Sequence, residues 1–215
     1  MSIVHANTDS LARRVAEGLR KISTAIRSRA WKEAGKRRMT PLQAQTLAVL
    51  RMQPEQAARI SILADELAVS LPTVSDMVRT LEKKGLIQKS RSQQDARIVT
   101  VRLSAKGKRI AGERQDFLAD VAGRLAVSEQ EAMLQVLMKM IQTLHARGDI
   151  RTARMCVTCR FFRPNAFQNP KRPHHCDFFK ESFGNRLLRI ECPAHEPAPK
   201  ADANQKWKIF TISRM

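Results

Sequence analysis

The sequence predicts a mainly α-helical fold with a small β-hairpin wing, that is, a winged helix-turn-helix, followed by a small loop-rich module. Two adjacent short segments each place apolar residues at positions i, i+3, i+4 and i+7, as one-sided helices do. A hairpin with period-two alternation follows them directly. The chain has 215 residues, and all four of its cysteines fall within residues 156–192. The first two observations predict the winged helix, and the third predicts a separate module.

The chain begins with a basic, one-sided helix over residues 9–34. Its apolar residues recur at steps of three and four: Leu11, Val15, Leu19, Ile22 and Ile26. An apolar stripe of this kind is normally buried, which predicts that it packs against another chain or against the C-terminal helices. A second helix follows Thr40, which suits the N-cap before Pro41 and can form a capping box with Gln43. This helix should end near Met52, because Pro54 follows it.

The next two helices are short and joined by a tight turn. The first should bury Ile60, Leu63, Ala64 and Leu67. The second should bury Val74, Met77, Val78 and Leu81. Ser70 suits the N-cap of the second helix, Pro72 its first turn and Gly85 its C-terminal stop. Two such helices in succession indicate a helix-turn-helix.

Two strands and two further helices complete this part of the prediction. Residues 86–91 and 98–103 alternate as half-buried strands around a polar tip, and together they form the wing. Ser104 should cap a long helix that reaches about Leu125, and Ser128 should open another with a capping box. Gly148 closes that last helix, whose apolar stripe is Met133, Leu137, Met140, Ile141 and Leu144.

The charge of the chain indicates the class of partner. Lys and Arg number 39 against 20 acidic residues, a formal net charge of +19, which favours a polyanion, and nucleic acid before a membrane. No run of 18 uninterrupted apolar residues is present, so we expect no membrane span, and the first residues lack an apolar leader core, so we expect a cytoplasmic protein. No nucleophile elbow, phosphate-binding glycine loop or carboxylate dyad is found, so we expect no enzymatic activity and no catalytic residues.

The outward face of the second short helix has the composition of a major-groove reader. With the apolar stripe inward, the face presents Thr73, Ser75, Asp76, Arg79 and Lys83. Arginine reads guanine, while short hydroxyls contact base edges or phosphates. Arg91 and Arg97 on the wing add cations for the flanking backbone or minor groove. A polar face on any surface helix looks similar, but the order of elements in so basic a chain favours DNA binding.

Residues 63–109 resemble the DNA-binding core of the MarR family of bacterial transcriptional regulators. The resemblance is carried by the motifs Thr73–Ser75, Leu81–Ile87, Asp95 with Arg97, and Leu103–Gly107. The general helical layout extends it to about residues 9–147. The resemblance implies an obligate homodimer, joined by its N- and C-terminal helices, that binds a palindromic double-stranded DNA operator. We expect the protein to act there as a repressor. It also implies that Asp95 braces the wing while Arg97 enters the minor groove.

The chain departs from this family after its last predicted helix. Cys156 and Cys159 form a Cys-x-x-Cys knuckle, and Cys176 and Cys192 follow after gaps of 16 and 15 residues. Four thiolates suit tetrahedral Zn²⁺ or an iron–sulfur cluster. His195, three residues after Cys192, and His174 or His175, beside Cys176, are alternative ligands. Phenylalanines could form an apolar shell around a centre: Phe161, Phe162, Phe178, Phe179 and Phe183.

Several interpretations of the cysteines remain open. Free thiols in a flexible segment, or a redox Cys-x-x-Cys without metal, are alternatives to a metal centre. A short region rich in proline cannot build a core alone, which favours a metal as its staple. The long gaps and Pro193 point toward iron–sulfur and the Cys-x-x-His knuckle toward zinc; the balance leans to iron–sulfur. The centre would then serve the regulator as a redox or metal sensor or as a structural staple.

Two other functions compete with this one. In the first, the chain is an electron-transfer or carrier metalloprotein that uses the winged helix to bind proteins. In the second, a small-molecule effector binds between the dimer helices of a MarR-type repressor, and a zinc ion is purely structural. The predicted organisation is an N-terminal dimerisation helix (1–39), the winged helix-turn-helix (40–104), C-terminal dimerisation helices (105–150), the cysteine-rich metal module (151–196) and a tail (197–215).

Overall fold

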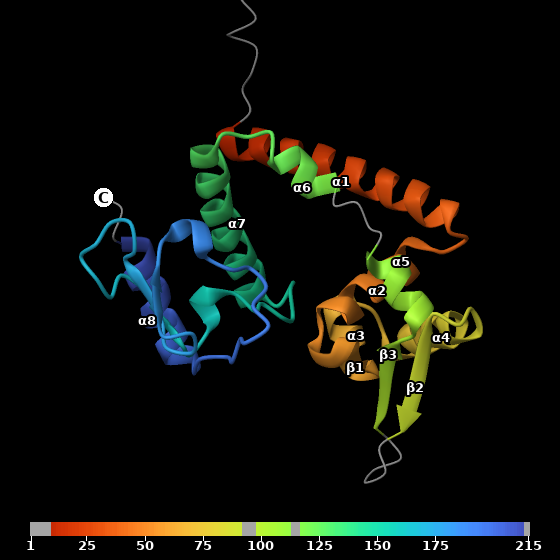
Figure 1. Cartoon of the computed structure of the whole chain (residues 1–215). Helices are drawn as coiled ribbons and strands as arrows, with labels where there is room; N and C mark the ends of the chain where they lie inside the picture. The colour runs from red at the N-terminus through yellow and green to blue at the C-terminus, as the bar shows by residue number, and fades with distance from the viewer. Residues whose placement is uncertain (1–9, 92–97, 113–116, 213–215) are drawn as a thin grey trace, which may run out of the picture.

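The computed structural model of the chain describes residues 10–91, 98–112 and 117–212. Figure 1 shows α1 (Leu11–Lys36) crossing above two bodies, the winged helix on one side and the cysteine module on the other, with α7 (Val127–Arg147) running down beside the module. Each body has its own hydrophobic core. No helix within the described ranges is long and apolar enough to span a membrane.

The first two helices both begin at a capping side chain, and the cap of the second was predicted. Ser10 Oγ accepts from the N–H of Arg13 and begins α1. Thr40 and Gln43 form the reciprocal capping box at the start of α2 (Pro41–Met52), with N···O distances of 3.2 and 3.3 Å. Because these bonds satisfy backbone donors that a helix leaves open, they fix where α2 begins.

The helix-turn-helix consists of α3 (Ile60–Leu67) and α4 (Leu71–Lys83). Ala68 ends α3 in the left-handed conformation, with φ of 52°, and Ser70 caps α4 through the N–H of Thr73. The predicted inward residues are buried, with Ile60 packed at the edge of the core: Leu63, Ala64, Leu67, Val74, Met77, Val78 and Leu81. The helical periodicity therefore identified this core correctly.

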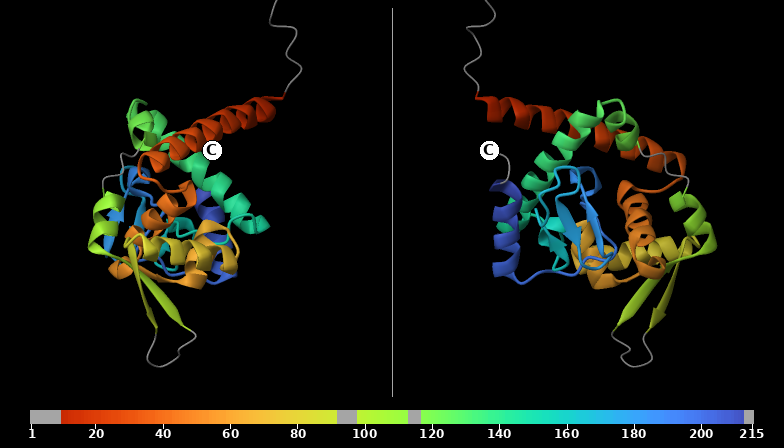
Figure 2. Two further views of the ribbon diagram at one scale, coloured as in Figure 1. Left: turned by 90° about the vertical axis from the view of Figure 1, so that its right-hand side faces the viewer. Right: turned by 60° about the vertical axis from the view of Figure 1, so that its left-hand side comes forward.

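The wing is a three-stranded antiparallel sheet in the order β1-β3-β2. The hairpin of β2 (Ile87–Arg91) and β3 (Val99–Leu103) was predicted, and it projects from the body in the views of Figures 1 and 2. The short β1 (Ala57–Arg59), which pairs with β3, was not predicted. Its sequence has little strand preference, so its pairing with β3 determines its conformation.

The segment after the wing differs in part from the prediction. Ser104 Oγ accepts from the N–H of Gly107, as the cap of α5 (Ala105–Gly112) should. A Cβ on Gly107 would overlap the carbonyl oxygen of Leu86, which explains why glycine stands there. The single helix expected to reach Leu125 is described as α5 and α6 (Phe117–Ala122), and residues 113–116 lie outside the described ranges.

The prediction for α7 is wrong in two details. The helix begins after Ala126, whose N–H donates to Glu129, so Ser128 lies inside the first turn and is not the cap. Met138, outside the predicted stripe, is fully buried. The reason is that one side of α7 packs on the cysteine module, through Leu134, Met138 and Ile141. Gly148 ends the helix in the left-handed conformation, as predicted.

The cysteine module is more regular than the loop-rich region that was expected. A second three-stranded antiparallel sheet, in the order β4-β5-β6, consists of β4 (Phe162–Arg163), β5 (His174–Cys176) and β6 (Glu181–Phe183). Short 3-10 turns, η3 (Cys156–Thr158) and η4 (Asn185–Leu187), lie on either side of this sheet in the chain. The expected loose tail is also wrong, because α8 (Lys200–Ile212) packs Phe210 into the module core.

Candidate nucleic-acid interface and cysteine module

The outward face of α4 is the first part of the candidate interface. Thr73, Asp76, Arg79 and Lys83 are exposed there, and Ser75 is half-buried. The Arg79 guanidinium lies 3.0 Å from the Asp76 carboxylate, one turn earlier on the helix. Because both partners are well exposed, this ion pair adds little stability, and Arg79 can exchange it for a phosphate or base at low cost.

A groove of about 310 Å³ connects α4 to the wing. It brings together Ser75, Arg79 and Arg91, three of the predicted site residues, and adds Lys89. Sequence reasoning missed Lys89, although it stands two residues before Arg91 on β2, so that both side chains project from the same face of the strand. Its ammonium group lies 2.7 Å from Glu82. Arg97 and Asp95, the predicted wing-tip residues, lie outside the described ranges.

Apolar side chains on α1, α6 and α7 are exposed in the single chain. They include Leu11, Val15, Ile22, Leu118, Val121, Met133, Val136 and Leu144. The α1 residues belong to the predicted stripe, and the α7 residues lie on the side of the helix away from the module. Large contiguous apolar surfaces on a globular protein mark places where something else packs.

A pocket of about 480 Å³ lies between α1, α2, α5 and α6. Its apolar lining includes Trp31, Met39, Leu47 and Phe117, and Arg37 and Glu33 add charge. The Arg29 guanidinium stacks over the Phe117 ring at 5.4 Å. A pocket that is mostly apolar with a few charged groups has the composition of a small-molecule site.

The four cysteines gather in the C-terminal module as free thiols. Cys159 and Cys192 are buried, and Cys156 and Cys176 are half-buried. Burial raises the pKa of the Cys156 thiol to about 11; the Arg189 N–H opposes this, while Cys192, Cys159 and Cys176 add to it. The three other thiols therefore lie within electrostatic range of Cys156. Within the described ranges, no three His, Cys, Asp or Glu side chains meet closely enough to hold one metal ion.

Arg189 contacts two of the sulfurs. Its backbone N–H donates to Cys156 Sγ at 3.3 Å, and its guanidinium lies 3.9 Å from Cys192 Sγ. The guanidinium also stacks over the Phe179 ring at 4.9 Å. Of the predicted aromatic shell, Phe162 is in the module core, whereas Phe178 and Phe179 are largely exposed. The phenylalanines are thus divided between the core and the surface.

The histidines beside the cysteines have other partners. His174 is buried; its Nδ1 accepts from the Asn165 N–H and its Nε2 lies 2.9 Å from Asn185 Oδ1. His195 Nε2 lies 3.0 Å from the Thr158 hydroxyl. Burial lowers the pKa of His195, against a hydrogen bond with the Thr158 backbone that raises it, and nearby Arg154 lowers it further.

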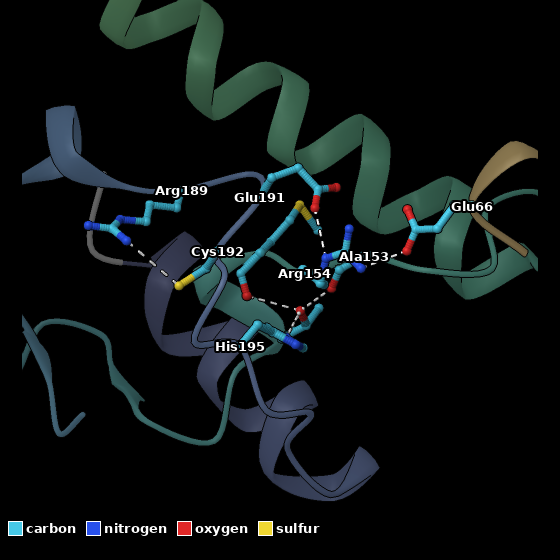
Figure 3. A network of polar contacts seen from close by, with 9 residues as sticks. Glu66, Ala153, Arg154, Arg189, Glu191, Cys192 and His195 are labelled. Atoms are coloured by element: carbon cyan, nitrogen blue, oxygen red, sulfur yellow. Dashed lines mark hydrogen bonds and ion pairs between the residues drawn. The ribbon is translucent and has the colours of Figure 1, made fainter. Parts of the chain in front are cut away.

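Arg154 connects the module to the winged helix, and sequence reasoning did not find this contact. Figure 3 shows its guanidinium between Glu66 of α3 and Glu191 of the module, at 2.6 and 2.9 Å. Its backbone carbonyl accepts from the N–H of Cys192. Arg151 makes a second pair with Asp65 of α3, at 2.8 Å. Opposite charges separated by more than 80 residues carry no local signal in a sequence.

Comparisons of the sequence place the similarity in the winged helix. Residues 39–99 match the model of the MarR family. The HTH-type transcriptional regulator TtmR of Methylorubrum extorquens is 27% identical over 106 residues, which are 48% of this chain and 54% of that protein. The organic hydroperoxide resistance transcriptional regulator of Bacillus subtilis is 24% identical over 106 residues, 48% of this chain and 72% of that one. The matched part thus spans about half the length of the first relative.

Solved structures share the fold of about three fifths of this chain. The S. aureus MepR–DNA complex matches with a TM-score of 0.53 at 25% identity, covering 60% of this chain and 97% of that one. Streptococcus pneumoniae FabT in complex with DNA matches with a TM-score of 0.56 at 26% identity, covering 63% and 98%. The matched part of this chain therefore has the winged-helix fold of these structures, and residues 39–99 carry the MarR family pattern.

Proposed function

We propose that this protein is a MarR-type transcriptional regulator that binds a double-stranded DNA operator as a homodimer, acting as a repressor. The observation that carries the proposal is the basic groove between α4 and the wing, lined by Arg79, Lys89 and Arg91. It lies in the part of the fold shared with structures solved in complex with DNA. The proposal assigns the chain no catalytic step.

The two elements that line the groove would contact different parts of the DNA. Ser75 and Arg79 on α4 would meet base edges in the major groove, where a bidentate arginine reads guanine. Lys89 and Arg91 on β2 would contact phosphates, which position the helix without reading sequence. Asp95 and Arg97 keep their proposed roles of bracing the wing and entering the minor groove. The net charge of +19 increases the rate of encounter with any DNA.

The exposed apolar faces of α1, α6 and α7 support the homodimer. A second copy would cover the same face on its partner, as a two-fold interface requires. Two recognition helices would then read half-sites about one helical turn, roughly 10 bp, apart. The operator should accordingly be a palindrome.

The proposal is tested by operator selection from random DNA, followed by affinity measurement at physiological salt. Arg79→Ala should weaken operator binding by about 1–3 kcal/mol and relax preference at one base position. Arg147→Ala is the matched control, because this arginine is exposed at the end of α7, away from the groove. If no sequence is enriched, the proposal fails. That result would favour the alternative function, in which the winged helix binds proteins.

The C-terminal module would add a second input to the regulator. The four cysteines would have to approach one another more closely than in this structure to ligate a metal or iron–sulfur centre, which would act as a redox or metal sensor, or as a structural staple. The pocket of about 480 Å³ supports an alternative, in which a small-molecule effector controls the repressor and the metal is structural zinc. A shift in operator affinity on metal removal favours the sensor, and a shift only on adding an apolar effector favours the alternative.

A further inference from the structure

Three phenylalanine rings and two arginines form a continuous row on the cysteine module. The ring centroids of Phe161 and Phe178 lie 5.4 Å apart, and those of Phe178 and Phe179 lie 5.0 Å apart. At one end of the row, the Arg160 guanidinium lies over the Phe161 ring at 5.3 Å. At the other end, the Arg189 guanidinium lies over the Phe179 ring at 4.9 Å. The row therefore combines aromatic surface with a positive charge at each end.

The rings of Phe178 and Phe179 lie at the tip of a hairpin. They are the two middle residues of the four-residue turn that joins β5 to β6. Such turns favour glycine, asparagine, aspartate and proline, each of which suits the bent backbone. Here the two phenylalanines are 51% and 43% exposed. An exposed aromatic pair at a hairpin tip adds little to the core of the module, and it indicates contact with another molecule.

The sheet of the module holds the row in place. The Asp177 N–H donates to the carbonyl oxygen of Phe161 at 2.9 Å and so joins the turn to the residue before β4. Phe161 itself is half-buried and packs against the core of the module. Because side chains on an ordered backbone lose less entropy on binding than those on a flexible one, the row is suited to bind a flat partner at low cost.

The charge around the row favours an anionic partner. Residues 151–212 contain twelve Lys and Arg residues against five Asp and Glu residues. The Arg189 guanidinium contacts a ring and a sulfur and, in the part of the chain that the structure describes, pairs with no carboxylate. The Arg160 guanidinium lies 3.0 Å from Glu196, but both side chains are more than half exposed. Water weakens such a pair, so a phosphate can replace the carboxylate.

We propose that this row is a second nucleic-acid surface, which binds the unpaired bases of a single strand. Every base has a flat π face, so bases of any identity stack on exposed aromatic rings. Phe178 and Phe179 would each stack against one base, and Arg160 and Arg189 would contact phosphates on either side. Bases in a duplex are already paired and stacked, so the row selects single strands. This inference goes beyond the proposed binding of a double-stranded operator.

A protein partner fits the row less well than a nucleic-acid strand. A specific protein interface buries about 800 Å² on each side, and three rings supply only a small part of such an area. A strand, in contrast, presents bases and phosphates at short intervals, which match rings that are flanked by arginines. The excess of positive charge in the module also complements a phosphate backbone.

The row lies apart from the groove proposed for the operator. That groove is lined by residues of α3, α4 and the wing. In Figure 3, Arg189 lies on the far side of Cys192 from Arg154 and Glu66, the ion pair that joins the module to α3. A strand bound at the row would therefore leave the groove free for duplex DNA.

Binding of two fluorescent strands of about 12 nucleotides to the full chain tests the row. One strand carries a thymine at every position, and the other has the same phosphates with an abasic site in place of each thymine. Because the whole chain is basic, both strands should bind, but the thymine strand should bind about tenfold more tightly. A uracil RNA strand of the same length, used as a competitor, distinguishes RNA from DNA as the preferred source of bases.

Substitutions of Phe178 separate stacking from charge. Phe178→Ala should weaken binding of the thymine strand about fivefold or more and that of the abasic strand less than about twofold. Phe178→Leu keeps an apolar contact with Phe161 but has no π face, and it should lose the same preference without unfolding the turn. Phe178→Trp should retain it. Phe167→Ala is the matched control, because Phe167 is 49% exposed but contacts His175 and not the row.

Arg189→Gln tests the phosphate contact at the end of the row. It should weaken binding of both strands alike, and the slope of log Kd against log salt should fall by about 0.7. Lys208→Gln, on the exposed side of α8, is the control for net charge and should leave the slope nearly unchanged. Equal effects of the two variants would remove Arg189 from the surface and overturn the proposed row.

Several further results would overturn the single-strand surface. They are equal affinity of the wild type for both strands, an equal loss on both strands in Phe178→Ala, and a Phe178→Leu variant that keeps the full preference for bases. If Phe178→Ala changes the sedimentation coefficient but not the preference, the row packs against a second copy and the proposal fails. Phe178→Ala should not change operator affinity. If the wild type binds no operator but prefers the thymine strand, the proposed regulatory function fails and this surface stands.

Discussion

The core of the winged helix consists of aliphatic side chains and methionines, whereas the core of the cysteine module also contains phenylalanines. In the first, Leu47, Leu50, Leu63 and Val78 come from neighbouring helices. In the second, Met138 comes from α7, Phe162 from β4 and Phe210 from α8. His174 and Lys206 are buried in the same region and satisfied by hydrogen bonds. The core of the module therefore forms only when segments that are distant in the sequence pack together. The core of the winged helix is built from helices whose apolar residues repeat with a local period.

Because of this difference, the loss of a single contact should have different effects on the stability of the two bodies. In the winged helix, α2, α4 and α5 are capped by neighbouring side chains and each helix buries one face, so a single lost contact should leave the rest in place. The strands of the module are two or three residues long and have little stability of their own. A single lost contact there should open the whole module, which is why a metal staple would stabilise it strongly.

The largest effect is expected from Phe162→Ala. Phe162 is fully buried, and its ring lies 5.3 Å from that of His174 and 6.3 Å from that of Phe210. Its loss should destabilise the module by about 3–5 kcal/mol through lost burial and a cavity. Limited proteolysis should then cut residues 151–212 while the winged helix resists. Equal loss of protection in both bodies would show that they unfold as one unit.

A pair of glycine substitutions compares the two bodies directly. A Cβ on Gly107 would overlap Leu86 O, and a Cβ on Gly184 would overlap Lys171 O. Each alanine variant should cost about 1–3 kcal/mol, seen as a lower Tm of the body that contains it. Gly18→Ala is the control, because nothing lies within 4 Å of the added carbon on α1. If Gly184→Ala leaves the Tm unchanged, the loop that contains Lys171 must move to make room for the added carbon.

Lys206→Met tests the polar part of the module core. The ammonium group donates to Cys159 O at 3.1 Å and Arg160 O at 2.9 Å, and pairs with Asp202 at 2.8 Å. Methionine keeps the packing but removes these bonds, at a cost of about 1–3 kcal/mol in denaturant unfolding of the module. Lys208→Met, on the exposed side of α8, should change little. If both variants lower the stability of the module equally, the cause is the lost positive charge on α8 and not the lost hydrogen bonds of Lys206.

The smallest effect concerns the winged helix. Arg91→Ala should remove one phosphate contact, so the slope of log Kd against log salt should fall by about 0.9, with similar losses on operator and random DNA. Lys139→Ala on α7 is the control for net charge. An unchanged slope would place β2 away from the DNA backbone. A loss confined to the operator would instead make Arg91 a base reader.

Most of the winged helix was predictable because its signals are local. Val74, Met77, Val78 and Leu81 repeat with the helical period, and Thr40, Ser70 and Ser104 cap helices within three residues of their partners. The exception is β1, whose Ala57-Ala58-Arg59 has no strand signal and depends on pairing with β3. Lys89 was also missed, although its two-residue spacing from Arg91 on β2 places both side chains on the face that lines the groove.

The module was harder to predict because its contacts are remote. The sequence located the four cysteines, but the division of the phenylalanines between core and surface depends on tertiary closure. Phe210 of α8 is buried in the core and Trp207 packs against it, although α8 has weak one-sided character. The Arg154–Glu66 pair spans 88 positions, a separation at which charge patterns predict nothing.

The two faces of α7 connect subunit association with the folding of the module. Met138 and Ile141 pack inward on the module, while Met133, Val136 and Leu144 remain exposed for the proposed partner. One rigid helix that takes part in both equilibria makes them thermodynamically linked, so dimerisation should raise the affinity of the module for its ligand by the same factor by which the ligand raises dimerisation. The occupancy of the module would then rise with the concentration of the protein itself.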